Sequence, residues 1–257
     1  MKKTAMLLLS LLLCLAAVTA SAAGRMDGII QRGELRVGTT GDYKPMSYLD
    51  KETGNYEGFD TEAAAMLAEA MGVKVRFVPT TWPTLAQDTM DGKFDIAMCG
   101  ITRTFAREKT MDMSKGYLLF GKTILVRKGD ANKFRSVADL NQPSVRVMVN
   151  PGGTNEKFAR ANLPNASIIV HPQNAEIPGL VADGKADVMI TETMEARRYV
   201  RDNARLAAPL VEEPFTKNQF GILMAKGDQD FLNFINFWME EMEMNGTLKA
   251  LERKYID

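Results

Sequence analysis

The chain has 257 residues with 32 basic and 32 acidic side chains, two cysteines and a single histidine, His171. The balanced charge argues against a nucleic-acid partner, because a surface that binds phosphates is usually basic. One histidine excludes a zinc site built from several histidines, and a Ser-His-Asp triad would depend on His171 alone, in a strand-like run before Pro172. Any proton chemistry therefore falls to carboxylate, lysine or tyrosine side chains.

Residues 1–22 predict a secretory signal peptide. Lys2 and Lys3 precede an apolar run over residues 5–18, and small residues follow it. The run is shorter than the roughly 20 residues that span a bilayer. Without this segment the formal charge is about −2, and Cys99 is the only cysteine, which excludes an intrachain disulfide. We expect a periplasmic protein without stable membrane association.

The remaining chain alternates β-rich runs with helical patterns. Strands are predicted at residues 34–40, 73–78, 94–98, 145–149 and 167–170, with a return strand near Gln219. Helices are predicted at residues 61–71, 85–90, 175–182 and 229–255, the last with a break at Asn245-Gly246. This alternation predicts an α/β fold with largely parallel sheets flanked by helices.

An internal repeat suggests two lobes. Residues 90–100 (MDGKFDIAMCG) and 182–192 (ADGKADVMITE) share Asp-Gly-Lys-x-Asp followed by an apolar strand. We place the first lobe at residues 23–119 and 218–257 and the second at residues 120–217. In open α/β sheets ligands bind beyond the carboxyl ends of strands, so the ends of both repeats should face a cleft between the lobes. A common helix-turn-strand connection without functional meaning would also explain the repeat.

Charged residues follow both predicted strand ends. Arg103 and Arg107 come after the first repeat and would share one side of a helix that begins at Thr104. Glu192 and Glu195 come at the end of the second repeat and just after it. The planar guanidinium of arginine suits carboxylate recognition, although a solvated surface arginine is the simpler alternative for either residue.

The turn at residues 150–155 is a second candidate site. Gly152 and Gly153 allow a tight bend, and a helix that begins near Thr154 would present free backbone N–H groups to an anion such as a carboxylate. Thr154 could equally be a plain helix cap. The spacing of the glycines does not match a nucleotide-binding P-loop. Lys122 could face the same cleft or lie in solvent.

Two sets of motifs carry resemblances that cover nearly the whole chain after residue 22. The first set resembles the periplasmic amino-acid-binding proteins of ABC importers: GTTGDYKPMSY (38–48), EGFDTEAAAMLAEAMG (57–72), ITRTFAREK (101–109) and DGKADVMITE (183–192). The second is similar to the periplasmic cyclohexadienyl dehydratases: PTTWPTL (79–85), GKTILVR (121–127), NPGGTNEKFARANL (150–163) and TETMEARR (191–198). Both imply a two-lobed type II periplasmic-binding-protein fold with the ligand cleft between the lobes.

The resemblances also imply roles for single residues. Similarity to the binding proteins implies that Arg107 and Thr154 hold a ligand carboxylate, and that Glu192 stands where the binders carry an acid, commonly aspartate, for the ligand ammonium. Similarity to the dehydratases implies that Glu195 is the general acid. The remaining pocket residues implied by these resemblances are Tyr43, Trp82, Arg103, Lys122 and Asn150.

The dehydratase resemblance implies a reaction without a metal or cofactor: prephenate or arogenate loses water and carbon dioxide to give phenylpyruvate or phenylalanine. The ring hydroxyl needs a proton to leave as water, yet a free glutamate with a pKa of about 4.3 is ionised at neutral pH. Burial beside Trp82 and beside a second carboxylate would push Glu195 toward its protonated form. The alternative is a non-catalytic receptor that delivers an amino acid to an importer permease.

Overall fold

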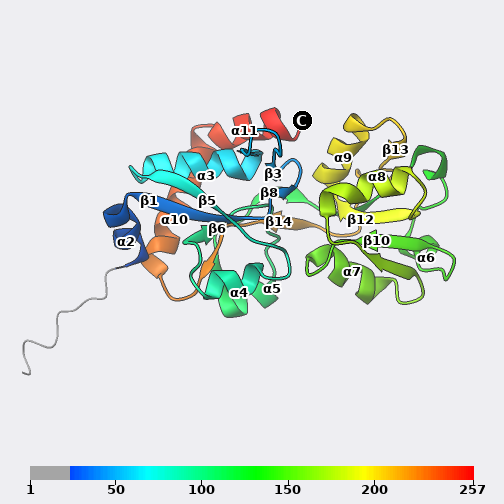
Figure 1. Ribbon diagram of the computed structural model, residues 1–257, viewed down its shortest axis with the longest axis horizontal. Coiled ribbons are helices and arrows are strands. Elements are labelled where there is room, and N and C mark those ends of the chain that lie inside the picture. Colours follow the sequence, from blue (N-terminus) through cyan, green and yellow to red (C-terminus); the bar gives the residue numbers. More distant parts are fainter. Residues whose placement is uncertain (1–23) are drawn as a thin grey trace, which may run out of the picture.

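The computed structural model describes residues 24–257, which form two lobes side by side (Figure 1). The predicted signal peptide lies outside the described residues. The N-terminal and C-terminal parts of the chain, blue to cyan and orange to red, lie in one lobe, and the green and yellow middle part forms the other. The predicted two-lobed α/β fold is confirmed, while the exact lobe limits given above stay a prediction.

The first lobe is built on a five-stranded sheet in the order β5-β1-β6-β15-β7. Its strands are β1 (Glu34–Thr39), β5 (Lys74–Pro79), β6 (Ile96–Ala97), β7 (Met111–Met113) and β15 (Leu223–Ala225). Its helices are α2 (Arg25–Arg32), α3 (Phe59–Ala70), α4 (Leu85–Met90), α5 (Phe105–Thr110), α10 (Gln229–Met244) and α11 (Thr247–Tyr255). β1 pairs in parallel with β5 and β6, and the return strand β15 pairs antiparallel with β6 and β7.

The second lobe repeats this plan with the strand order β11-β10-β12-β9-β13. Its strands are β9 (Lys122–Arg127), β10 (Arg146–Val149), β11 (Ser167–Val170), β12 (Val188–Glu192) and β13 (Leu206–Ala207). Its helices are α6 (Val137–Leu140), α7 (Thr154–Asn162), α8 (Ile177–Ala182) and α9 (Thr193–Asp202), with 3₁₀ turns at Lys128–Asp130 (η1) and Asn174–Glu176 (η2). β10 is parallel to β11 and β12, whereas β9 is antiparallel to β12 and β13.

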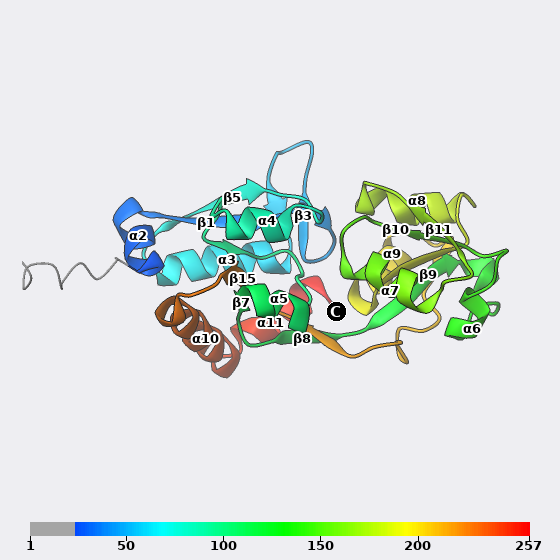
Figure 2. The same cartoon turned by 90° about the horizontal axis from the view of Figure 1, so that it is seen from below.

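Two small sheets lie outside these lobe sheets. β2 (Asp42–Tyr43), β3 (Ser47–Leu49) and β4 (Tyr56–Glu57) form one, and β8 (Tyr117–Phe120) pairs with β14 (Asn218–Phe220) to form the other. Figure 2 shows the chain passing between the lobes from β8 to β9 and returning along the orange segment. The predicted lobe limits lie near these two connections, the first inside β8 and the second directly before β14, and they stay a prediction.

Apolar clusters cover both faces of each sheet. In the first lobe one cluster packs beneath α3 and α10 and a second beneath α4, and in the second lobe the clusters lie beneath α7 and beneath α8 and α9. All five residues of β12 are buried, as expected for a strand covered on both faces. No helix among residues 24–257 is long and apolar enough to cross a membrane.

The sequence repeat occupies equivalent places in the two lobes. Asp95 precedes β6 and accepts hydrogen bonds from the backbone and side chain of Arg36 on the neighbouring strand β1. Asp187 precedes β12 and makes the same contacts with Arg146 on β10. Both aspartates also donate their backbone N–H to the carbonyl of the partner arginine. The repeat therefore reflects a real structural correspondence between the strands that end at the cleft.

Some element limits differ from the predictions. β6 spans only Ile96–Ala97, whereas the apolar pattern suggested 94–98. The helix predicted at 175–182 opens with the 3₁₀ turn η2, and α8 begins at Ile177 with Pro178 in its first turn, where a missing N–H costs nothing. The predicted break at Asn245-Gly246 separates α10 from α11, because Gly246 adopts a left-handed φ of 80°.

Candidate active site between the lobes

A cavity lies where the two lobes meet. The first lobe lines it with Tyr43, Trp82, Gly100, Thr102 and Arg107, and the second with Asn150, Gly153, Thr154, Asn155, Asn174 and Glu192. The empty space between these side chains, counted out to the solvent-open mouth, is about 310 Å³. Residues at the ends of both repeats are among the lining, as the sheet topology predicts.

A buried ion pair joins Lys122 to Glu192. The two residues lie directly opposite each other on the antiparallel strands β9 and β12, and they are 3% and 4% exposed. The Lys122 ammonium also donates to Thr154 Oγ1 at 2.7 Å and Asn155 Oδ1 at 2.6 Å, so each of its N–H groups has an acceptor. Burial lowers the pKa of Lys122, and the Glu192 carboxylate counteracts this effect. Strand register therefore places a cation against Glu192.

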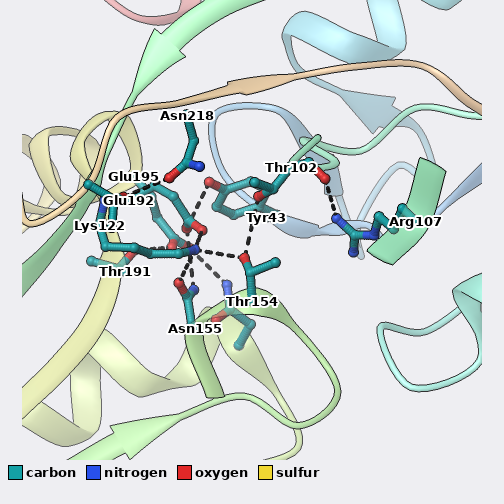
Figure 3. Close-up of polar contacts among 12 residues, drawn as sticks. Tyr43, Thr102, Arg107, Lys122, Thr154, Asn155, Thr191, Glu192, Glu195 and Asn218 are labelled. Carbon is teal, nitrogen blue, oxygen red and sulfur yellow. Dashed lines mark hydrogen bonds and ion pairs between the residues drawn. The ribbon is translucent and has the colours of Figure 1, made fainter. Parts of the chain in front are cut away.

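Glu192 also reaches across the cavity. Its Oε2 accepts a hydrogen bond from the Tyr43 hydroxyl at 2.9 Å and another from Asn155 Nδ2 at 3.3 Å (Figure 3). Burial and the nearby Glu192 carboxylate hold the pKa of Tyr43 well above its usual range, so the phenol is a donor. The acid that the binding proteins would offer to a ligand ammonium is here bound to the protein's own lysine.

Glu195 lies in the first turn of α9 and is 0% exposed. Its carboxyl accepts hydrogen bonds from Asn174 Nδ2 at 2.7 Å and from the Thr191 hydroxyl. Burial raises the pKa of Glu195 well above its ordinary value, and the adjacent Glu192 carboxylate raises it further, whereas the two hydrogen bonds act in the opposite direction. The buried environment of Glu195 therefore favours its protonated form. Glu195 is not among the cavity-lining residues, but it contacts Asn174, which is one of them.

Aromatic side chains form the wall contributed by the first lobe. The rings of Tyr43 and Trp82 meet edge to face with centroids 5.9 Å apart, and Trp82 Nε1 donates to Asp42 Oδ1 at 3.0 Å. Trp82 was expected beside Glu195. That placement stays a prediction, and the hydrogen bonds of Glu195 come from Thr191 and Asn174.

Arg107 and Thr154 border the cavity on the side where a ligand carboxylate was expected. The predicted helix start is confirmed, because the Thr104 hydroxyl caps α5 by accepting the Arg107 backbone N–H. Arg107 Nη1 donates to the Thr102 carbonyl at 2.6 Å, and burial lowers the pKa of this guanidinium, which stays cationic. Gly153, not Thr154, is the cap of α7, so the Thr154 hydroxyl is left to contact Lys122 and Thr102.

The other expected pocket residues divide into two groups. Asn150 is buried and lines the cavity. Arg103 is exposed and lies outside the lining, with its aliphatic stem packed over Gly221, where a Cβ would come within 2.8 Å of Arg103 Cγ. Within residues 24–257 no group of three or more His, Cys, Asp or Glu side chains could hold a metal ion.

Sequence reasoning missed Asn155 and Asn174. Asn155 directly follows the predicted contact Thr154, so its place in the turn could have revealed it. Asn174 lies in the loop HPQNAE, where nothing in the sequence marks it. It enters the site only because η2 packs next to β2 of the other lobe.

Comparison with known proteins finds similarity to a cyclohexadienyl dehydratase and to amino-acid-binding proteins. It is 42% identical to the cyclohexadienyl dehydratase of Pseudomonas aeruginosa strain PAO1, over 97% of this chain and 94% of that protein. It is 28% identical to the L-cystine-binding protein TcyJ of Escherichia coli K12, over 91% of this chain and 86% of that protein.

Solved structures agree with these relatives. The ancestral amino acid-binding protein AncCDT-1, described as a precursor of cyclohexadienyl dehydratase, matches 91% of this chain and 100% of its own with a TM-score of 0.85 and 42% identity. A mutant of ArgBP from T. maritima matches 90% and 98% with a TM-score of 0.83 and 28% identity. The model of the bacterial extracellular solute-binding proteins, family 3, matches residues 35–257, and the chain therefore belongs to that family.

Proposed function

We propose that the protein is a periplasmic cyclohexadienyl dehydratase that converts prephenate to phenylpyruvate and arogenate to phenylalanine, with Glu195 as the general acid. The observation that carries this proposal is the environment of Glu195. Burial of this carboxyl next to a second carboxylate raises its pKa well above the ordinary value and so favours the protonated acid, and its hydrogen-bond donors are neutral. A receptor for amino acids has no use for such an acid, whereas dehydration requires one.

The reaction uses only groups that this chain supplies. The bond between the ring and its carboxylate breaks, and its electron pair moves into the ring as carbon dioxide leaves. The hydroxyl on the opposite ring carbon takes the Glu195 proton and departs as water, so the ring becomes aromatic. Arg107, which lines the cavity, supplies positive charge for a carboxylate of prephenate. Glu195 is left ionised and must regain a proton before the next turnover.

The two glutamates have different chemical environments, and this separates their roles. Glu192 is paired with the Lys122 ammonium and accepts from Tyr43, so it is a charged group that organises the pocket. Among the described residues, Glu195 has no cation in its hydrogen-bond contacts, and its raised pKa makes it the member of the pair that we assign as the acid. Such a separation of two neighbouring carboxyl groups is how acid and base roles are usually assigned in enzymes.

The second candidate is an amino-acid receptor, and the relatives favour it, since TcyJ and AncCDT-1 are both described as binding proteins. An importer permease would then be a partner. The Lys122–Glu192 ion pair weakens this alternative, and with it the arogenate reaction relative to the prephenate reaction, because a ligand ammonium would have to share Glu192 with a cation that is already in contact.

The test is to incubate the purified protein with prephenate at neutral pH and follow phenylpyruvate by its absorbance in base. A protein-free sample at the same pH corrects for spontaneous conversion. Phenylpyruvate formed above that background supports the dehydratase. Absence of product, together with tight calorimetric binding of a free amino acid, would establish the receptor instead.

A further inference from the structure

Asn174 joins the predicted acid to the opposite lobe. It is 2% exposed, begins the turn η2 and lines the cavity. Its Nδ2 donates to Glu195 Oε1 at 2.7 Å and to the backbone carbonyl of Asp42 at 3.2 Å. The first contact lies within the second lobe and the second crosses to the first lobe. The side chain therefore holds its full set of donor contacts only when the lobes meet.

The other end of the same amide has no partner. Oδ1 of Asn174 is buried and accepts no hydrogen bond from any residue that the structure describes. The orientation of the amide is fixed by Asp42, because a backbone carbonyl can only accept and must face the nitrogen. Leaving a buried acceptor unpaired costs about 1–3 kcal/mol. Since Asn174 lines the cavity, a ligand is the natural source of the missing donor.

Prephenate offers one donor for this acceptor. Its two carboxylates and its keto group only accept hydrogen bonds, so the ring hydroxyl is its sole O–H. We propose that Asn174 is a substrate-binding and positioning residue of the dehydration, which accepts the ring hydroxyl on Oδ1 while Nδ2 holds the Glu195 carboxyl beside it. This inference rests on the proposed function.

The arrangement orients the leaving group. The oxygen and nitrogen of an amide are bonded to the same carbon, so a hydroxyl on Oδ1 and a carboxyl on Nδ2 are neighbours. With its own hydrogen directed at Asn174, the hydroxyl oxygen has lone pairs free to take the Glu195 proton. That oxygen then carries both hydrogens, the carbon–oxygen bond breaks and water leaves. Asn174 gives up no proton in this step.

The experiment compares Asn174→Leu with a matched control, Gln173→Leu. Gln173 is the preceding residue, is exposed and lies outside the cavity lining. We expect Asn174→Leu to lower kcat with prephenate on the order of 100-fold, as for loss of one preorganised polar contact, while Gln173→Leu keeps wild-type kcat. Binding of phenylpyruvate, which lacks the ring hydroxyl, should change little in both variants.

A pH profile distinguishes this role from a merely structural one. The N–H of Asn174 lowers the pKa of Glu195, so its removal raises that pKa and moves the alkaline limb of kcat to higher pH. The other titratable groups that interact with Glu195 are unchanged by the substitution: Glu192, Asp42, Lys122, Tyr43 and Tyr199. Asn174→Asp keeps the shape of the side chain and so serves as a second variant if Asn174→Leu does not fold. It should move the alkaline limb of kcat further, because it adds another carboxylate next to Glu195.

The outcomes separate the two proposals. An active wild-type protein whose Asn174 variants keep kcat, or lose it with no shift of the alkaline limb, overturns the role of Asn174 and leaves the dehydratase intact. A wild-type protein that forms no phenylpyruvate overturns both. A fall in kcat with the shifted limb and retained phenylpyruvate binding supports both.

Discussion

Replacing Glu195 with glutamine removes the acid proton and almost nothing else. Glutamine has the same shape and keeps an oxygen that can accept the Asn174 N–H, now 2.7 Å from Glu195 Oε1. General acid catalysis contributes roughly 10²- to 10⁴-fold, which corresponds to about 3 to 5 kcal/mol of activation free energy. We expect kcat with prephenate to fall by this factor while prephenate still binds, because Arg107 in the cavity lining is unchanged.

The same substitution should make the protein more stable. Burial raises the folded-state pKa of Glu195 above its ordinary value of 4.5, so its contribution to stability is complete below about pH 4.5 and is lost as the pH rises through the folded-state pKa. Glutamine cannot ionise and escapes this loss. From about pH 4.5 up to the folded-state pKa, the variant gains on the wild type by about 1.4 kcal/mol for each pH unit, and the gain stays constant at higher pH.

Two assays test the pair of expectations. Phenylpyruvate formation gives kcat, calorimetry gives prephenate binding, and urea denaturation at about pH 5 and about pH 8 gives the free energy of unfolding. Retained turnover in Glu195→Gln would move the acid to another residue, with Glu192 the first to examine. A variant that is less stable than the wild type at about pH 8 would refute the claim that the buried carboxyl is neutral.

Three further substitutions test the structure around the site. Lys122→Met leaves the Glu192 carboxylate buried without its cation and should lower the free energy of unfolding by about 3–5 kcal/mol. An unchanged urea midpoint would show that the Lys122–Glu192 ion pair is not formed. Gly152 has a φ of 77°, and Gly152→Ala would place a Cβ 2.7 Å from Pro83 Cα in the opposite lobe. Calorimetry should therefore show weaker prephenate binding, and an unchanged affinity would contradict the close approach of the lobes. Burial raises the pKa of Asp60 from 3.8 to about 6, so the wild type should lose about 3 kcal/mol of unfolding free energy as the pH rises from about 4 to about 6. Urea denaturation of Asp60→Asn across that range should show no such loss. Equal pH dependence of the unfolding free energy in the two proteins would rule out the raised pKa.

Local patterns in the sequence predicted most of the fold. The helix at residues 85–90 and the strand at residues 167–170 have the limits expected from their apolar spacing. The repeat predicted two equivalent strand ends, and the matched contacts of Asp95 and Asp187 confirm that they correspond. These features depend on neighbouring residues or on repeated motifs, and both are visible in one sequence.

The contacts that define the site depend on residues far apart in the chain. The pairing of Lys122 with Glu192 follows from the antiparallel register of β9 and β12, which no short motif encodes. Arg103 shares a helical spacing with Arg107, yet only Arg107 lines the cavity, because the chain turns at the Thr104 cap between them. Sequence spacing therefore identified candidate residues more reliably than their partners.

Under the proposed function, Lys122 explains how an amino-acid-binding scaffold can serve a substrate without an ammonium group. In the binding proteins the acid at the end of the second repeat would await the ammonium of the ligand. Here the protein supplies that ammonium itself, in a buried contact held by strand register and by Thr154 and Asn155. The resulting ion pair keeps Glu192 charged, and that charge acts through the same desolvated interior to hold the proton on Glu195. The Lys122 ammonium also attracts the Glu195 carboxylate and opposes this effect, so burial, the largest cause of the raised pKa of Glu195, is what favours the protonated acid.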